Sequence, residues 1–367
     1  MGFQCGIVGL PNVGKSTLFN ALLSTMQAAA ANYPFCTIEP NVGRVEVPDD
    51  RLDKLAAIAG SAKRIPTQLE FVDIAGLVRG ASKGEGLGNK FLSHIREVDA
   101  VIYVLRCFEE SDVVHVEGRV DPLGDAEIVE TELMLADLES VEKRLPAAQK
   151  KARLGATEAS EQAAILERVL AVLADGRPAR DLVVKDAADR KLLNSLQLIT
   201  TKPVMYVCNV DEANAATGNS LSDQVRAMAE KRGAPCVVVS ARIEAEISLL
   251  TDPAERAEFL SSLGLPETGL SRVIRAGYQL LNLVTYFTVG PKEARAWTIP
   301  AGMLAPQAAG VIHTDFEKGF IRAETIACDD YLTCEGEAGA RKAGKFRLEG
   351  KEYEVRDGDV LHFRFNV

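Results

Sequence analysis

A nine-residue loop near the start of the chain constrains the fold more than any other stretch. Residues 9–17 read GLPNVGKST and fit the pattern GxxxxGK[ST], which describes a loop that wraps around phosphate groups. An apolar run at 5–8 precedes the loop and an amphipathic run at 17–24 follows it, so a strand, the loop and a helix are expected in that order. Such a loop presents backbone N–H groups at the positive end of the helix. The sequence therefore predicts an α/β fold of the P-loop NTPase type, with a mostly parallel, doubly wound sheet.

Further residues are expected to hold phosphate and Mg²⁺. Lys15 would reach the β and γ phosphates, and the Ser16 hydroxyl suits Mg²⁺, which binds few protein ligands. Thr37 stands 20 residues after the loop in an extended segment, where a nucleotide switch would place a second ligand. Asp73 lies at the end of an apolar strand, as in the Walker B arrangement, and the Gly76 N–H can face a γ-phosphate. We predict Lys15 and Gly76 as catalytic residues and Ser16, Thr37 and Asp73 as the metal site.

The base-recognition segment arrives late in the chain. Residues 209–212 read NVDE and follow an apolar strand, in the place where a GTPase has NKxD. The NKxD carboxylate accepts the N1–H and N2 amino groups of guanine, but here the lysine is valine and the aspartate is glutamate, one methylene longer. We therefore do not expect guanine selection, and adenine would be contacted largely by backbone groups. The predicted base contacts are Asn209, Val210, Glu212, Ser240 and Ala241, the last two through backbone amides after a strand at 237–239.

A helical insertion explains the long separation between the Walker B aspartate and the base-recognition segment. Asp73 and Asn209 are 136 residues apart, whereas a βαβ unit needs roughly 30. Amphipathic helices are expected at 125–153, with Pro146 as a kink or an early end, and at 157–174, and two such helices joined by a short turn pack as an antiparallel hairpin.

The C-terminal part is expected to be a separate α+β module. Short strands are predicted at 285–289, 295–299 and 360–365, with a hairpin at 345–355 and a helix at 303–311. The predicted domains are residues 1–281, including the insertion at 125–200, and residues 282–365.

Composition excludes several classes of protein. The 367 residues carry a formal net charge of −10, which disfavours DNA as a partner bound through the field of the whole molecule, although 143–153 and 341–351 are locally basic. No apolar run approaches eighteen residues, so no membrane span is expected, and the chain opens on a strand, so we expect no signal peptide and a cytoplasmic protein. The seven cysteines form no CxxC pair and are expected to be reduced.

The order of motifs resembles one family over the whole chain. GLPNVGKST, YPFCTIEPN, DIAGLVRGASKGEGLGNKFL, NVDE and HTDFEKGFIRAE together look like the YchF-type proteins of the Obg-related GTPase family. The resemblance implies a Mg²⁺-dependent nucleotidase that prefers ATP to GTP, with a coiled-coil insertion and a C-terminal TGS domain of β-grasp type. It also implies association with the ribosome, through rRNA or ribosomal proteins.

The same resemblance assigns residues. Val210 would contact adenine through its backbone, and Ser16 and Thr37 would hold Mg²⁺. Leu77 stands where Ras-like enzymes have a catalytic glutamine, and an apolar side chain cannot orient water, so slow turnover is expected. Asn12 occupies a position where some related GTPases hold K⁺. The residues expected on the ATP phosphates are Asn12, Val13, Gly14, Lys15, Ser16 and Thr17.

Three functions remain open from the sequence. The first is a slow ATPase that acts as a switch on the ribosome. The second is a ribosome- or RNA-binding module in which the nucleotide is structural and hydrolysis is incidental. The third is a GTP-preferring GTPase.

Overall fold

The chain divides into two units. In the computed structural model the first comprises Phe3–Gly43 and Glu70–Val273, and the second comprises Arg44–Leu69 and Ile274–Val367. The expected division after residue 281 differs from this one, because residues 44–69 cluster with the C-terminal residues. The residues that the structure describes are 3–30, 42–74, 87–109 and 120–366.

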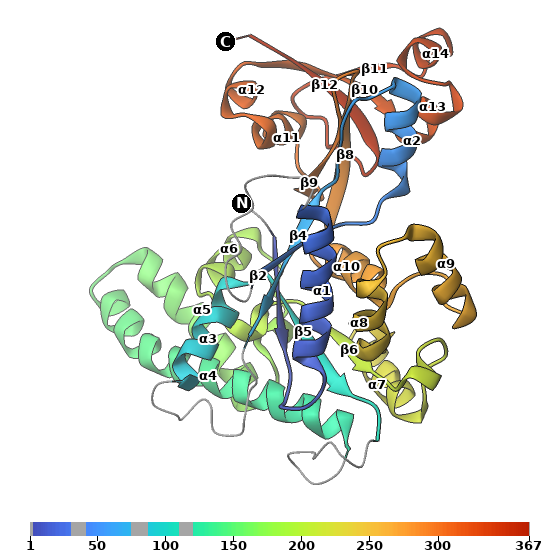
Figure 1. The fold of residues 1–367 in the computed structure, drawn as a ribbon. Helices are drawn as coiled ribbons and strands as arrows, with labels where there is room; N and C mark the ends of the chain where they lie inside the picture. Colours follow the sequence, from blue (N-terminus) through green and yellow to red (C-terminus); the bar gives the residue numbers. More distant parts are fainter. Residues whose placement is uncertain (1–2, 31–41, 75–86, 110–119, 367) are drawn as a thin grey trace. The chain divides into compact units, whose positions relative to one another are not determined.

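A largely parallel sheet forms the centre of the first unit (Figure 1). Its strand order is β2-β4-β1-β5-β6-β7, and the pairs β1–β4, β1–β5, β5–β6 and β6–β7 are parallel. Every residue of β5 and β6 is buried, as expected for strands covered on both faces. The strands are β1 (Gln4–Val8), β2 (Val42–Glu46), β4 (Gln68–Asp73), β5 (Ala100–Arg106), β6 (Val204–Asn209) and β7 (Cys236–Val239).

Helices cover this sheet, with α1 packed against α8 and α4 against α7. Together with the phosphate-binding loop between β1 and α1, this arrangement confirms the expected P-loop fold. None of the helices in the described ranges has the length and apolarity needed to cross a bilayer. The helices of the first unit are α1 (Lys15–Ala30), α3 (Leu87–Glu97), α4 (Pro122–Arg153), α5 (Thr157–Ala174), α6 (Ala187–Ser195), α7 (Ser220–Lys231), α8 (Ala241–Leu249) and α9 (Pro253–Ser262). Helix α10 (Gly269–Leu280) begins in the first unit, and its residues from Ile274 on belong to the second.

The insertion is a helical hairpin with its own core. Helices α4 and α5 pack along each other, and α4 runs through Pro146 to Arg153, so Pro146 does not end it. Among the described residues of this unit, short 3₁₀ helices lie at η1 (Ala179–Asp181), η2 (Ile199–Thr201) and η3 (Glu212–Asn214). The buried core of the insertion consists of Val141, Ala148, Ala163, Ile165, Leu166, Val169, Leu173, Ala179, Leu193, Leu196 and Leu198.

The second unit is a mixed sheet with helices on it. Its strand order is β11-β10-β12-β8-β9-β3, and its first long strand, β8, pairs in parallel with the last, β12. The strands are β3 (Arg64–Ile65), β8 (Leu283–Val289), β9 (Ala294–Pro300), β10 (Phe320–Ala327), β11 (Arg347–Glu349) and β12 (Asp359–Phe365). The helices are α2 (Asp50–Ala59), α11 (Ala305–Ile312), α12 (Thr314–Lys318), α13 (Cys328–Thr333) and α14 (Glu337–Lys342).

Helix α2 belongs to the core of this second unit, and Figure 1 shows it in blue among the orange and red elements. It starts at the side chain of Asp49, which accepts from Arg51 N–H, and its apolar face buries Leu52 and Leu55. Those leucines pack in one cluster with Phe287 and other residues of the C-terminal sheet. The early segment therefore completes the C-terminal core.

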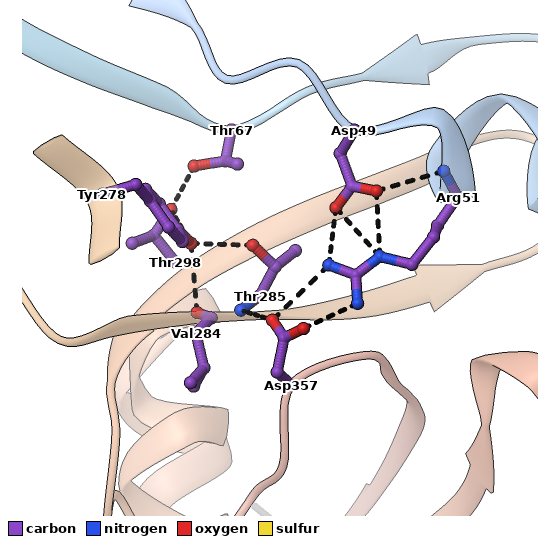
Figure 2. Close-up of polar contacts among 8 residues, drawn as sticks. All are labelled: Asp49, Arg51, Thr67, Tyr278, Val284, Thr285, Thr298 and Asp357. Atoms are coloured by element: carbon purple, nitrogen blue, oxygen red, sulfur yellow. Dashed lines mark hydrogen bonds and ion pairs between the residues drawn. The ribbon is translucent and has the colours of Figure 1, made fainter. Parts of the chain in front are cut away.

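Polar contacts fix the same segment, as Figure 2 shows. The guanidinium of Arg51 donates through Nη1 to Asp357 Oδ2 at 2.7 Å and through Nε to Asp49 Oδ1 at 2.9 Å. The hydrogen bonds to Asp49, and then those to Asp357, raise the pKa of Arg51 above its ordinary value. Asp357 in turn accepts from Thr285 N–H at 2.8 Å, which anchors the ion pairs to strand β8.

The expected hairpin at 345–355 is wrong. Strand β11 pairs with β10, and Glu354 bridges to Leu304 instead of returning along β11. The reason is packing, because Tyr353 and Val355 join the cluster of buried side chains beneath α11. Strand β10 itself lies where the sequence analysis predicted no strand.

Candidate functional site

The phosphate-binding loop has backbone angles that match its sequence. Gly14 has φ of +89°, and a Cβ there would collide with the side-chain amide of Asn209. A Cβ at Gly9 would lie 2.6 Å from the Val104 carbonyl oxygen. Asn12 also has a positive φ, of 63°, a region that asparagine tolerates better than most residues. The loop geometry thus requires glycine at positions 9 and 14.

Lys15 and Asp73 form an ion pair at the end of this loop. The Lys15 Nζ donates to Asp73 Oδ1. Lys15 is buried, and Asp73 is the last residue of β4. Parallel pairing of β1 with β4 places Asp73 opposite Ile7, two residues before the loop begins. The structure therefore brings together two residues that the sequence analysis assigned to phosphate and metal.

The oxygen donors at this point suit Mg²⁺. Ser16 is exposed in the first turn of α1, and Asp73 carries a carboxylate, and both are the hard ligands that Mg²⁺ prefers. Thr17 is exposed on the same turn, and Val13 is buried. Thr37 and Gly76, the other residues predicted for metal and catalysis, lie outside the described residues, as does Leu77.

Asn209 joins the phosphate-binding loop to the expected base pocket. Its Nδ2 donates to the Val13 carbonyl at 2.9 Å, and its Oδ1 accepts from the Ala241 N–H at 2.9 Å. The Val210 N–H donates to the Val239 carbonyl at 2.9 Å. A single buried amide therefore holds three segments in place that are far apart in the sequence.

The remaining predicted base contacts lie around this amide. Glu212 starts η3, and its carboxylate pairs with Arg242 of α8 at 2.8 Å. Ser240 precedes α8 and is 2% exposed, and its hydroxyl has no hydrogen-bond partner within the described residues. A buried hydroxyl without a partner is costly, so this one is suited to a bound polar group.

Two residues near the pocket escaped the sequence analysis. Phe108 follows Cys107, whose N–H donates to the Asn209 carbonyl at 2.8 Å, and the Arg106 guanidinium lies 4.7 Å from the ring centre of Phe108. Arg242 is the other. An aromatic residue directly after a buried strand was an available signal for Phe108, whereas the pairing of Arg242 depends on tertiary contacts.

Comparison with known proteins identifies relatives along the whole chain. A family model described as a 50S ribosome-binding GTPase matches residues 4–134, and the model YchF-GTPase_C, described as a protein of unknown function, matches residues 283–366. The chain is 58% identical over 367 residues to the Ribosome-binding ATPase YchF of Haemophilus ducreyi, and 53% identical over 369 residues to that of Bacillus subtilis. Each alignment covers all of both chains.

A solved structure matches equally fully. The Schizosaccharomyces pombe YchF GTPase superimposes with a TM-score of 0.89 at 39% identity, covering 99% of this chain and 98% of that one. The similarity thus includes the insertion and the C-terminal sheet as well as the phosphate-binding loop. These identities and the full-length coverage show that the chain belongs to the YchF family.

Proposed function

We propose that this protein binds ATP, hydrolyses it slowly with Mg²⁺, and uses the bound nucleotide as a switch when it associates with the ribosome. The observation that carries the proposal is the Asn209 amide, which ties the phosphate-binding loop to a base pocket that lacks the lysine and the aspartate of NKxD. Relatives with 53–58% identity that bear the name ribosome-binding ATPase support it.

The phosphate end supplies charge and positioning. Lys15 would neutralise the charge that develops on the transferring phosphoryl group, and the residues of 12–17 would hold the phosphates through backbone N–H groups. Ser16, Asp73 and Thr37 would hold Mg²⁺, which neutralises phosphate charge when bound. The Gly76 N–H would contact the γ-phosphate. The Lys15–Asp73 ion pair supports this assignment. When Mg²⁺ and ATP bind, Lys15 would contact phosphate in place of Asp73, and Asp73 would face Mg²⁺ in place of Lys15.

Backbone hydrogen bonds in the base pocket favour adenine. The Val210 N–H is committed to Val239, so contact from Val210 to the base would come from its carbonyl, an acceptor that suits the adenine N6 amino group. The Ala241 N–H, which the sequence analysis expected to face the base, instead donates to Asn209, and this removes a donor that the guanine O6 would need. The engagement of Ala241 disfavours guanine, and the carbonyl of Val210 matches adenine.

ATP is therefore expected to bind at least several-fold more tightly than GTP. Loss of a bidentate, charge-assisted contact to guanine typically costs a few kcal/mol, or roughly one to two powers of ten in affinity. Titration calorimetry with non-hydrolysable ATP and GTP analogues measures the ratio. Val210→Lys combined with Glu212→Asp should move it toward GTP. A wild-type preference for GTP would replace this reading with that of an ordinary GTPase.

Turnover without a partner is expected to fall far below the 1 to 10³ s⁻¹ typical of enzymes. The reason is Leu77, whose apolar side chain cannot position the attacking water. We also propose that K⁺ binds beside Asn12 and takes the place of a positively charged group that would otherwise stabilise the phosphates during hydrolysis. Steady-state rates measured in K⁺ and Na⁺ buffers of equal ionic strength should then differ, and equal rates would remove K⁺ from the site.

Ribosome association is tested by co-sedimentation. If the protein is a switch, the fraction that pellets with ribosomes should differ between the ATP-analogue, ADP and nucleotide-free states. An unchanged fraction in all three states would favour a binding module in which hydrolysis is incidental. We also propose that the protein acts in the cytoplasm, where it would meet the ribosome. We propose further that the C-terminal unit is a TGS-like domain and the insertion a coiled coil.

A further inference from the structure

An ion pair links two segments of the expected base pocket. Arg242 Nε lies 2.8 Å from Glu212 Oε1. Glu212 is the first residue of η3, three residues after Asn209, and Arg242 is the second residue of α8, next to Ala241. Asn209 and Ala241 are themselves hydrogen-bonded. The Glu212–Arg242 ion pair is therefore a second connection between the same two segments, in addition to the hydrogen bond between Asn209 and Ala241.

The pair engages the group that guanine would require. A carboxylate at the position of Glu212 is the acceptor for the N1–H and N2 amino groups of guanine, and here a guanidinium already binds it. Guanine would therefore have to compete with Arg242 for this carboxylate, because the guanidinium contacts Glu212 Oε1. Adenine carries an acceptor at N1, so it makes no use of the carboxylate and leaves the pair intact.

We propose that Arg242 is a specificity-determining residue, which acts through Glu212 by holding its carboxylate away from guanine and so favours ATP. The inference rests on the proposed function, since it concerns the base that enters the same pocket. It adds a second reason for the weak binding of guanine. The NVDE segment carries a longer carboxylate side chain than NKxD, and Arg242 also pairs with that carboxylate.

The exposure of the pair sets the size of the effect. The side chains of Arg242 and Glu212 are 72% and 49% exposed, and exposed ion pairs are weak and screened by salt. Removing the guanidinium should therefore shift the ratio of GTP to ATP affinity by about two- to fivefold toward GTP. The same shift should appear in the wild type when salt is raised from about 0.05 M to about 0.5 M, since the Debye length shortens over that range.

The test compares dissociation constants for non-hydrolysable ATP and GTP analogues by titration calorimetry. Arg242→Gln should shift the ratio toward GTP, and Arg242→Lys, which restores a cation, should return it toward the wild-type value. In Arg242→Gln combined with Glu212→Ala the gain for GTP should vanish, because the freed carboxylate is absent. Arg226→Gln is the matched control, since Arg226 pairs with Asp223 at 3.0 Å on α7 and is 45% exposed.

Each outcome decides the role of Arg242. Equal weakening of both analogues by Arg242→Gln would mean that Arg242 supports the pocket without discriminating between bases, which overturns the inference. An unchanged ratio overturns it as well, as does a shift that persists in the double variant. If the wild type itself prefers GTP, the proposed base choice fails. If the wild type prefers ATP and Arg242→Gln leaves the ratio unchanged, only the role of Arg242 fails.

Discussion

Replacing Lys15 with alanine is expected to lower ATP hydrolysis by about a hundredfold or more. The ammonium group is the buried positive charge at the end of the phosphate-binding loop, and it would face the phosphoryl group on which negative charge develops. Its removal also leaves Asp73 without the cation that it contacts. Phosphate release measured under single-turnover conditions, with Mg²⁺ present and the protein in excess over ATP and raised until the rate saturates, separates this loss from weaker binding.

Two variants make the result specific. Lys15→Arg keeps the charge but changes the length and shape of a buried side chain, so it should also be strongly impaired if position matters as well as charge. Lys231→Ala removes an exposed lysine at the end of α7 in the same unit and should leave hydrolysis unchanged. Turnover of Lys15→Ala within about threefold of the wild type would exclude this lysine from the phosphate site, because loss of a charged contact to the transition state typically lowers the rate by about a hundredfold or more.

Replacing Asp137 with alanine is expected to destabilise the helical insertion by about 3–5 kcal/mol. Asp137 is fully buried, and its carboxylate accepts from Ile199 N–H at 2.9 Å, from Thr200 N–H at 2.7 Å and from the Thr200 hydroxyl at 2.7 Å. Burial raises the pKa of Asp137, while these hydrogen bonds oppose that shift. Alanine would leave two buried N–H groups at the start of η2 without an acceptor.

Hydrogen exchange followed residue by residue locates the loss. The amides of Ile199 and Thr200 should exchange faster in Asp137→Ala, and urea denaturation should show a lower midpoint. Asp137→Asn keeps one oxygen acceptor, so its loss should be smaller. Asp175→Ala, at an exposed position that pairs with Arg177 at 3.0 Å, is the control and should change little. Unchanged protection of η2 in Asp137→Ala would show that these hydrogen bonds do not hold it.

The cysteines test a simpler expectation. Six of the seven lie in the described ranges, where each is a free thiol. Burial raises the pKa of Cys5 to about 12, so its thiol stays protonated and unreactive at neutral pH.

Local sequence determined the elements that carry phosphate chemistry. The glycines and the lysine of 9–17 act within one loop, so their spacing alone was sufficient to place a strand before them and a helix after them. Helix α5 matches its predicted bounds of 157–174 because its apolar periodicity and its ends are encoded in neighbouring residues.

Strand β10 shows where such periodicity fails. Its pairing with β12 shifts register between Phe320 and Arg322, so Ile321 and Arg322 are both exposed while Ala323 to Ile326 are buried. A shift of one residue moves every following side chain to the other face, which removes the alternation by which a strand is found. The partners that create the shift are Phe365 and Arg364, which lie 45 and 42 residues later in the chain than Phe320 and Arg322.

The sequence by itself determined the P-loop and the helical hairpin, and it supplied the residues that we propose for the phosphate and base sites. Only the tertiary structure decided that residues 44–69 complete the C-terminal core, that Asn209 binds both Val13 and Ala241, and that Arg242 occupies Glu212. The physical reason is the range of the interactions. A loop or an amphipathic helix is specified by residues a few positions apart, whereas burial of Leu52 against Phe287 depends on partners more than 200 residues away, which no local pattern records.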